Sequence, residues 1–252
     1  MKKLGIIGAM TVEVETLKAH MTGCTLTQRA GMEFCEGKLS GLDAVVVQCG
    51  VGKVNAALCV QILCDCFGVT HVVNTGVAGS LNAALDIGDL VISTDAVYHD
   101  FDCNTLNPAY KVGQVPGLSV WSFPADPELK ELAFASSELV NPGHTQLGTV
   151  ASGDQFICNR EVKERIIANT GAICTEMEGA AIAHAAWRNG VPFVILRAIS
   201  DKADDSAEMD YPTFEAIAAK RCAAVTEQLA GQLLASKSGM RATAFAVARS
   251  VL

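Results

Sequence analysis

Apolar residues in this chain gather in short runs that alternate with longer segments of helical periodicity. The short runs predict buried strands at Leu4–Ala9, Ala44–Cys49, His71–Thr75, Leu90–Ser93, Gln146–Ala151, Ala172–Cys174 and Pro192–Ile199. The periodic segments predict helices at about Val12–His20, Val54–Phe67, Pro127–Leu139, Glu161–Asn169, Glu178–Asn189 and Thr213–Leu234. This alternation predicts an α/β fold with a mainly parallel sheet flanked by helices. Gly37, Gly41 and Asp43 favour a hairpin near the start, so the sheet is expected to be mixed.

The end of the chain differs in composition from the rest. No repeat and no linker interrupts the chain before about residue 235, so residues 1–234 are expected to form one catalytic domain. Residues 235–252 carry Lys237, Arg241 and Arg249 and no acidic residue. We expect a basic tail that is disordered or loosely docked, with a partner-binding helix as the alternative.

Composition and charge narrow the class of protein. Hydrophobic residues make up 50% of the 252 residues and charged residues only 18%, which is typical of a folded chain rather than a disordered one. The formal net charge of -8 argues against nucleic acid as a partner, because phosphate contacts need clustered Lys and Arg. A small nucleoside remains compatible with this charge.

Signals for export, membrane insertion and metal binding are weak. The start MKKLGIIGAM has too short an apolar run for a secretory signal, and Glu13 and Glu15 follow it closely. No run of about 18 apolar residues indicates a membrane span. The ten cysteines include no CxxC pair, so buried thiols in a reducing cytosol are expected rather than disulfides or a zinc site. We therefore expect a cytoplasmic protein without a metal site.

Polar and acidic residues follow the predicted strands where a ligand would bind. In an open α/β sheet, ligands bind at the carboxyl ends of the strands. The residues that follow the strands include Met10, Glu13, Val51, Gly76–Gly79, Phe156, Glu176, Met177, Glu178, Ser200 and Asp201. GVG at 50–52 is followed by Asn55 rather than by the third glycine of GxGxxG, and the chain has no GxxxxGK[ST]. A dinucleotide site and a nucleoside triphosphate P-loop are therefore not expected.

Several of these residues have structural interpretations as well as functional ones. Arg197 lies in a buried strand and needs a partner, for which Glu176 and Glu178 are candidates, with or without a role in chemistry. These two acids could also stabilise a helix N-terminus through its dipole. Asp201 could cap a turn, and Glu13 could be an ordinary residue of a first helical turn. Their joint placement at strand ends favours a shared site.

Eight segments in order carry a family resemblance. They are GIIGAM with Glu13 following, GVGKVNAA, NTGVAG, YHDFD, GQVPG, SGDQFI, EMEGAAIAH and RAISDKAD. From about Leu4 to about Leu234, the chain resembles the 5'-methylthioadenosine/S-adenosylhomocysteine nucleosidase family, within the purine nucleoside phosphorylase-like superfamily. The resemblance implies hydrolysis of the N-glycosidic bond of these adenine thionucleosides, with 5'-deoxyadenosine as a further candidate. Adenine and a 5-substituted ribose would be released without a cofactor, in methionine salvage.

The resemblance also implies roles for the acids. Glu13 would activate the attacking water, and Asp201 would protonate N7 of adenine with help from Ser200. Glu178 would bind the ribose hydroxyls, and Met177 would pack beneath the sugar. To be protonated near neutral pH, Asp201 needs a raised pKa, from burial or from neighbouring acids.

The rest of the predicted site would surround the base and the 5' substituent. Phe156 would stack on adenine, the backbone of Ile157 would read its edge, and Arg197 and Glu176 would shape the site. The alkylthio pocket would be lined by Met10, Val51 and Tyr211. The resemblance also implies a homodimer, in which a loop would reach into the site of the partner with Cys103, Leu106 and Pro116. Leu106 and Tyr211 depart from the aromatic residue and the Phe of some relatives, which leaves the preferred substrate open.

Three alternatives remain at this stage. A phosphorylase would need basic residues beside C1', and Lys53 is the nearby candidate. A related nucleosidase could act on a futalosine-type nucleoside or on AMP, although no arginine-rich phosphate pocket is apparent. A nucleoside-binding or storage protein could share the fold without the chemistry, which the presence of Glu13, Glu178 and Asp201 together disfavours.

Overall fold

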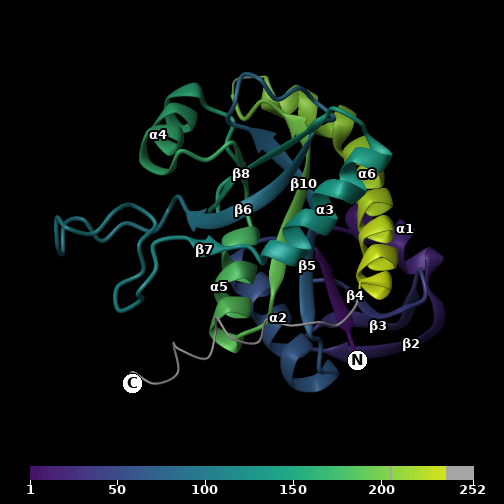
Figure 1. The fold of residues 1–252 in the computed structure, drawn as a ribbon. Helices are drawn as coiled ribbons and strands as arrows, with labels where there is room; N and C mark the ends of the chain where they lie inside the picture. Colours follow the sequence, from purple (N-terminus) through teal and green to yellow (C-terminus); the bar gives the residue numbers. More distant parts are fainter. Residues whose placement is uncertain (205, 237–252) are drawn as a thin grey trace.

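Four parallel strands from distant parts of the chain form the centre of the fold. In the computed structural model, which describes residues 1–204 and 206–236, β1 (Lys3–Gly8) pairs with β4 (Leu42–Gln48) and with β5 (His71–Ser80), and β5 pairs with β10 (Phe193–Asp201) (Figure 1). β5 and β10 are buried along nearly their whole length. Continuous apolar runs such as these are typical of parallel strands that are covered on both faces.

The second half of the sheet closes on itself through β10. This strand also pairs antiparallel with β6 (Leu90–Tyr98), which pairs in parallel with β8 (Thr145–Ser152). β8 pairs in parallel with β9 (Cys174–Glu176), which returns antiparallel to β5. Strands β10, β6, β8, β9 and β5 therefore form a closed ring, and β7 (Phe123–Pro124) adds to β6. The mixed, mainly parallel sheet predicted from the sequence is confirmed, whereas its closure was not predicted.

The hairpin near the start of the chain is confirmed and extended. β3 (Met32–Leu39) pairs antiparallel with β4 through a turn that contains Gly41, whose φ of 83° lies in the left-handed region that favours glycine. β2 (Thr22–Arg29) adds antiparallel to β3 at the edge of the sheet. β2 was not predicted because most of its side chains are exposed, so it lacks the apolar pattern that reveals a strand.

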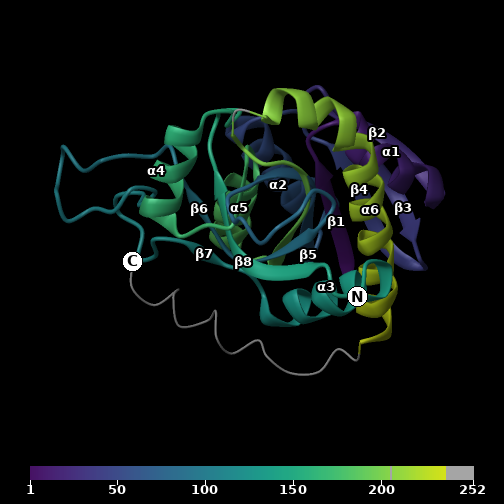
Figure 2. The same ribbon diagram turned by 90° about the horizontal axis from the view of Figure 1, so that it is seen from above.

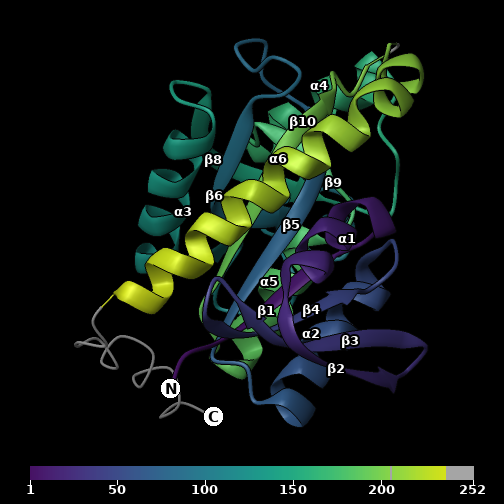
Figure 3. The ribbon, with the colours of Figure 1, turned by 90° about the vertical axis from the view of Figure 1, so that its right-hand side faces the viewer.

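Helices cover the sheet as the alternating pattern predicted. They are α1 (Thr11–His20), α2 (Lys53–Phe67), α3 (Pro127–Val140), α4 (Arg160–Thr170), α5 (Gly179–Asn189) and α6 (Ala207–Ala235). Figure 3 shows the long α6 crossing the face of β5 and β10 beside α1 and α3. α2 and α5 pack against each other. α6 begins at Ala207, before the predicted Thr213, and contains Pro212 within its first two turns.

The boundary predicted at residue 235 falls at the end of α6. The hydroxyl of Ser236 accepts a hydrogen bond from Lys2 Nζ at 2.5 Å and donates one to Glu128 at 2.8 Å, so this end is docked against the start of the chain and α3. Residues 237–252 of the predicted tail lie outside the described residues. Within the described part of the chain, no helix is both long enough and apolar enough to span a membrane.

One connection leaves the body of the molecule. Residues 99–122, which connect β6 to β7, form a long loop that extends outward, here called the excursion (Figure 1). The view from above shows the same loop (Figure 2). This segment carries the predicted partner-reaching residues Cys103, Leu106 and Pro116, and Leu106 is 76% exposed.

Candidate active site

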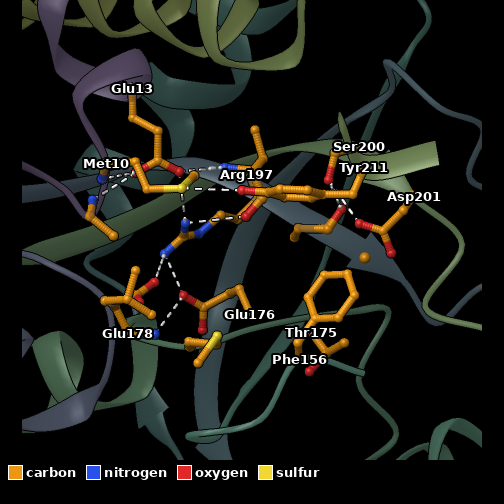
Figure 4. Close-up of a pocket in the computed structure, with 16 residues that line it drawn as sticks. Met10, Glu13, Phe156, Thr175, Glu176, Glu178, Arg197, Ser200, Asp201 and Tyr211 are labelled. Carbon is orange, nitrogen blue, oxygen red and sulfur yellow. Dashed lines mark hydrogen bonds and ion pairs between the residues drawn. The ribbon is translucent and has the colours of Figure 1, made fainter. Parts of the chain in front are cut away.

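A single pocket collects the residues that follow the strands. It encloses about 490 Å³ of empty space, open solvent at its mouth included. The predicted site residues that line it are Met10, Glu13, Val51, Phe156, Glu176, Met177, Glu178, Arg197, Ser200, Asp201 and Tyr211 (Figure 4). In Figure 4, Glu13 and Glu178 lie on one side of the pocket, and Asp201 and Phe156 lie on the other.

Arg197 holds the carboxylates on one side of the pocket together. Its side chain is almost fully buried on β10, and its Nη2 atom donates to Glu176 and to the side-chain oxygen of Asn74. The same atom lies 3.7 Å from Glu178 Oε2, and Nη1 lies 4.0 Å from Glu13 Oε1. The pairing of Arg197 with Glu176 and Glu178 was predicted, whereas the approach of Glu13 was not. Three carboxylates surround one buried cation, which compensates for its desolvation.

Glu176 is fixed by the helix that follows it. One of its carboxylate oxygens accepts hydrogen bonds from the backbone N–H groups of Glu178, at 3.0 Å, and Gly179, at 2.7 Å, at the start of α5. The other oxygen accepts the hydroxyl of Ser152, which itself accepts the N–H of Ala180 at 2.6 Å. Glu176 therefore stabilises the N-terminus of α5 and also pairs with Arg197, so both predicted alternatives hold.

Glu13 is a buried carboxylate aimed from the first turn of α1. It is 2% exposed, and it accepts the N–H groups of Ala9 at 2.6 Å, Met10 at 3.0 Å and Val77 at 3.1 Å. Burial raises the pKa of Glu13, and Arg197 and these N–H groups oppose the rise. A side chain at position 76 would collide with the carboxylate of Glu13 and the guanidinium of Arg197, which explains the glycine there. Glu13 is a first-turn residue as well as a pocket residue.

Glu178 is a further buried carboxyl group of the pocket. Its Oε1 atom accepts the N–H of Gly52 at 2.9 Å. Burial and the neighbouring Glu176 raise the pKa of Glu178 to about 7, against the opposing effect of Arg197 and the Gly52 N–H. With a pKa of about 7, Glu178 ionises near neutral pH. The ionised carboxylate can accept hydrogen bonds from hydroxyl groups of a ligand.

Asp201 lies at the opposite side of the pocket, at the end of β10. Its two oxygens accept the hydroxyl of Ser200 at 2.9 Å and the N–H of Ala203 at 2.8 Å. Burial raises the pKa of Asp201, and the nearby Asp210 and Asp204 add to the rise, while the hydrogen bonds from Ala203 and Ser200 oppose it. Asp201 thus forms a local turn, as one alternative predicted, and also presents to the pocket a carboxyl group whose pKa lies above its ordinary value.

Apolar side chains complete the walls. The hydroxyl of Tyr211, from α6, donates to the sulfur of Met10 at 3.1 Å. The ring of Tyr211 meets that of Phe156 edge-on, with centroids 5.6 Å apart. Phe156 is 47% exposed and lies at the mouth, so an apolar or aromatic ligand would cover a surface that is otherwise wet.

Four predicted residues do not line the pocket of this chain. The side chain of Ile157 packs in a separate cluster with Leu81 and Val97, so the prediction that its backbone reads the base remains a prediction. The other three, Cys103, Leu106 and Pro116, belong to the excursion between β6 and β7. Among the residues that the structure describes, no group of three or more His, Cys, Asp or Glu side chains could hold a metal ion.

Thr175 lines the pocket and was not predicted as a site residue. Thr175 pairs with Gly79 on β5, and Gly79 also pairs with Asp201 on β10, so Thr175 and Asp201 lie on either side of one glycine. The hydroxyl of Thr175 is buried and finds no hydrogen-bond partner among the described residues. Only the antiparallel return of β9 to β5 brings Thr175 here, and no local pattern in the sequence reveals that pairing.

The family model of the phosphorylase superfamily matches residues 3–230 of the chain. A 5'-methylthioadenosine/S-adenosylhomocysteine nucleosidase of Geobacillus kaustophilus is 41% identical over 222 residues, which cover 88% of this chain and 93% of the relative. The chain belongs to the 5'-methylthioadenosine/S-adenosylhomocysteine nucleosidase family of that superfamily. The resemblance found in the sequence is thereby confirmed.

Two solved structures illustrate the range of similar proteins. A 5'-methylthioadenosine/S-adenosylhomocysteine nucleosidase from Colwellia psychrerythraea, in complex with adenine, superimposes with a TM-score of 0.88 at 38% identity, over 92% of this chain and 96% of the other. A futalosine hydrolase of Helicobacter pylori superimposes with a TM-score of 0.86 at 31% identity, over 92% of this chain and 98% of the other.

The raised pKa of Glu178 predicts a pH-dependent effect of its substitution on stability. The folded pKa of about 7 exceeds the ordinary value of 4.5, so the folded state favours the neutral carboxyl group and ionisation destabilises it as pH rises through this window. Glu178→Gln should therefore gain stability relative to the parent between about pH 5 and pH 7, by about 2 kcal/mol, with a constant difference at higher pH. Denaturant unfolding across this range measures the effect. The exposed Glu131→Gln is the control, and a pH-independent difference for Glu178→Gln would contradict the prediction.

Proposed function

We propose that this chain hydrolyses the N-glycosidic bond of 5'-methylthioadenosine and S-adenosylhomocysteine, with 5'-deoxyadenosine as a further substrate. The products are adenine and the 5-substituted ribose, as methionine salvage requires. The observation that carries the proposal is the pair of buried carboxyl groups, Glu13 and Asp201, placed at separated positions in one pocket. Similarity to nucleosidases of that name over most of the chain supports the same reaction.

Asp201 acts as the general acid. Cleavage of the bond between C1' and N9 leaves positive charge on the sugar and pushes the bonding electrons onto the base, through an oxocarbenium-like state. A proton delivered to N7 lets adenine leave as a neutral molecule. The raised pKa of Asp201 favours the protonated form that this step needs, and the Ser200 hydroxyl orients the carboxyl group.

Glu13 acts as the general base. A water molecule adds to C1' and gives a proton to the Glu13 carboxylate. Three backbone N–H groups hold this carboxylate in one orientation, and with Arg197 they support its ionised form against the effect of burial. The reaction needs Glu13 ionised and Asp201 protonated in one pocket, and the cation beside Glu13 and the acids near Asp201 act in these two directions.

The remaining lining residues bind the substrate. Glu178 accepts hydrogen bonds from the ribose hydroxyls, and Met177 packs beneath the sugar. Phe156 stacks on adenine, with the backbone of Ile157 at its edge. The 5'-alkylthio group lies against a wall that consists of Met10, Val51 and Tyr211.

The charges of the pocket disfavour a phosphorylase. Arg197 lines the pocket, but three carboxylates already surround it. Lys53, the other candidate for binding phosphate, does not line the pocket, and its ammonium contacts both oxygens of Asp100. A phosphate beside C1' would meet Glu13 and Glu178 without a free cation among the described residues. The same excess of carboxylates disfavours AMP.

A futalosine-type nucleoside is the second candidate substrate. The similarity to a futalosine hydrolase favours it, since the two chains share the fold at 31% identity. The pocket is rich in acids, so it suits a 5' substituent that is neutral or zwitterionic better than one with a net negative charge. Comparison of adenine release from 5'-methylthioadenosine with base release from futalosine distinguishes the two.

Adenine release with and without phosphate tests the reaction class. The chain should release adenine from 5'-methylthioadenosine at the same rate in phosphate-free buffer and with added phosphate, with free methylthioribose as the co-product. Release that requires phosphate and yields a ribose 1-phosphate would establish a phosphorylase and remove the role of Glu13. No release from any of these nucleosides would point to a binding protein.

We also propose that residues 1–234 form the catalytic domain and that two copies of it form a homodimer. The exposed face of α2 and the turn before it present apolar side chains, Val51, Val54 and Leu58, which are 47%, 71% and 48% exposed. Apolar patches of this kind are typical of protein interfaces. The excursion with Cys103, Leu106 and Pro116 would then complete the alkylthio pocket of the partner. A cytoplasmic location fits the ten free cysteines, and fractionation of cells tests it.

Substitution on α2 tests the dimer. Analytical ultracentrifugation of the parent should give twice the mass of the chain, and Leu58→Lys should shift the species toward the monomer, because a charge would be buried in the interface. Leu139→Lys, on α3, is the matched control, since Leu139 is similarly exposed but lies outside the proposed interface. A monomeric parent, or equal effects of the two substitutions, would refute this interface.

A further inference from the structure

Three segments around the mouth of the pocket are joined by charged residues that do not line it. Lys53 begins α2, Asp100 follows β6, and Asp154 follows β8. The ammonium of Lys53 contacts the two oxygens of Asp100 at 2.7 and 2.6 Å and lies 3.6 Å from Asp154. One cation thus bridges two carboxylates on two different loops.

Backbone hydrogen bonds also connect the same three residues to one another. The N–H of Lys53 donates to Asp154 Oδ1 at 2.8 Å, and the N–H of Asp154 donates to Asp100 Oδ2 at 2.9 Å. The side chains of Lys53 and Asp100 are only 22% and 14% exposed. This geometry differs from that of an isolated surface ion pair, because charge and backbone contacts cooperate in a half-buried network. We call Lys53, Asp100 and Asp154 the loop clamp.

The loop clamp is adjacent to two groups of the pocket. Gly52 precedes Lys53, and its N–H donates to Glu178 Oε1 at 2.9 Å. Gly52 has a φ of 99°, and a side chain there would press against Asp154, so the turn depends on glycine and on the position of Asp154. Phe156 lies two residues beyond Asp154, on the same loop.

We propose that Lys53 is a positioning residue, which through the loop clamp aims the Gly52 N–H at the Glu178 carboxylate and holds the loop that carries Phe156. The inference rests on the proposed function, in which Glu178 binds the ribose and Phe156 binds the base. Lys53 touches neither group, so it governs substrate binding rather than the chemical step.

Loss of the loop clamp should change the ionisation of Glu178 in a defined direction. The charged groups that face Glu178 are Glu176 on β9, Arg197 on β10 and Glu13 on α1, and the Gly52 N–H is the donor from the turn before α2. A displaced Gly52 N–H removes a hydrogen bond that favours the ionised carboxylate. Glu178 then protonates at higher pH, and its ability to accept hydrogen bonds from the ribose hydroxyls is lost at higher pH.

Steady-state kinetics with 5'-methylthioadenosine between about pH 5 and pH 9 test the loop clamp. Lys53→Met should raise KM about tenfold near pH 7, the effect of losing one hydrogen bond to a charged group, and kcat should change by less than about threefold. The low-pH limb of the KM profile should move to higher pH. Lys53→Arg should restore the parent profile in large part, because it keeps the charge.

Lys38→Met is the matched control. Lys38 pairs with Asp43 at 2.6 Å on the exposed surface, so its loss should leave KM and its pH profile unchanged. A Lys53→Met variant that lowers kcat and kcat/KM equally, or leaves the KM profile in place, would overturn the proposal. Asp100→Asn removes the same ion pair and serves if Lys53→Met does not fold.

A readout without turnover separates this proposal from the proposed function. If the parent released no adenine, the nucleosidase function would fail while the loop clamp stayed testable by unfolding. The upper end of the pH window over which Glu178→Gln gains stability should then move to higher pH in a Lys53→Met background, because the folded pKa of Glu178 sets that end. An unchanged window would refute the loop clamp whatever the substrate of the protein.

Discussion

The rest of the site depends on the interaction of the buried Arg197 guanidinium with three carboxylates. A cation at this depth is stable only because Glu176, Glu178 and Glu13 approach it from three different elements. Each of these acids is in turn fixed by backbone N–H groups, from the start of α5, from Gly52 and from the turn before α1. The carboxyl ends of β1, β9 and β10 are thereby held in one arrangement around the pocket.

The same arrangement gives different surroundings to Glu13 and Asp201, the two acids that the reaction needs. Burial raises the pKa of Glu13, and the nearby Arg197 opposes part of that rise. The pKa of Asp201 is raised by burial and then further by two acidic neighbours, Asp210 and Asp204. Both pKa values are raised, but a cation and backbone N–H groups support the ionised form of Glu13, whereas acidic neighbours oppose ionisation of Asp201. Acid and base chemistry at one pH needs such a difference in surroundings. The asymmetry follows from the placement of Arg197 near one acid and the aspartates near the other.

Much of this could be predicted from the sequence because the signals are local. The long apolar runs of β5 and β10 predict buried parallel strands, and residues at or shortly after the end of a strand, such as Asp201 and Glu13, lie near its carboxyl end. Features that depend on distant pairing could not be predicted. The closure of the sheet through β10 and β6, the exposed edge strand β2 and the place of Thr175 beside Gly79 leave no periodic pattern. Likewise, spacing alone does not show that Lys53 is committed to Asp100.

The role of Asp201 as the proton donor is the central claim, and the turnover of Asp201→Asn on 5'-methylthioadenosine tests it most directly. Asn keeps the size of the side chain, and its one remaining oxygen can still accept the N–H of Ala203. Its amide group can donate to the Ser200 hydroxyl, which donates to Asp201 in the parent, but it cannot deliver a proton to N7. The account predicts that adenine release slows by about 10²–10⁴-fold while the nucleoside still binds. Release at the rate of the parent would contradict it.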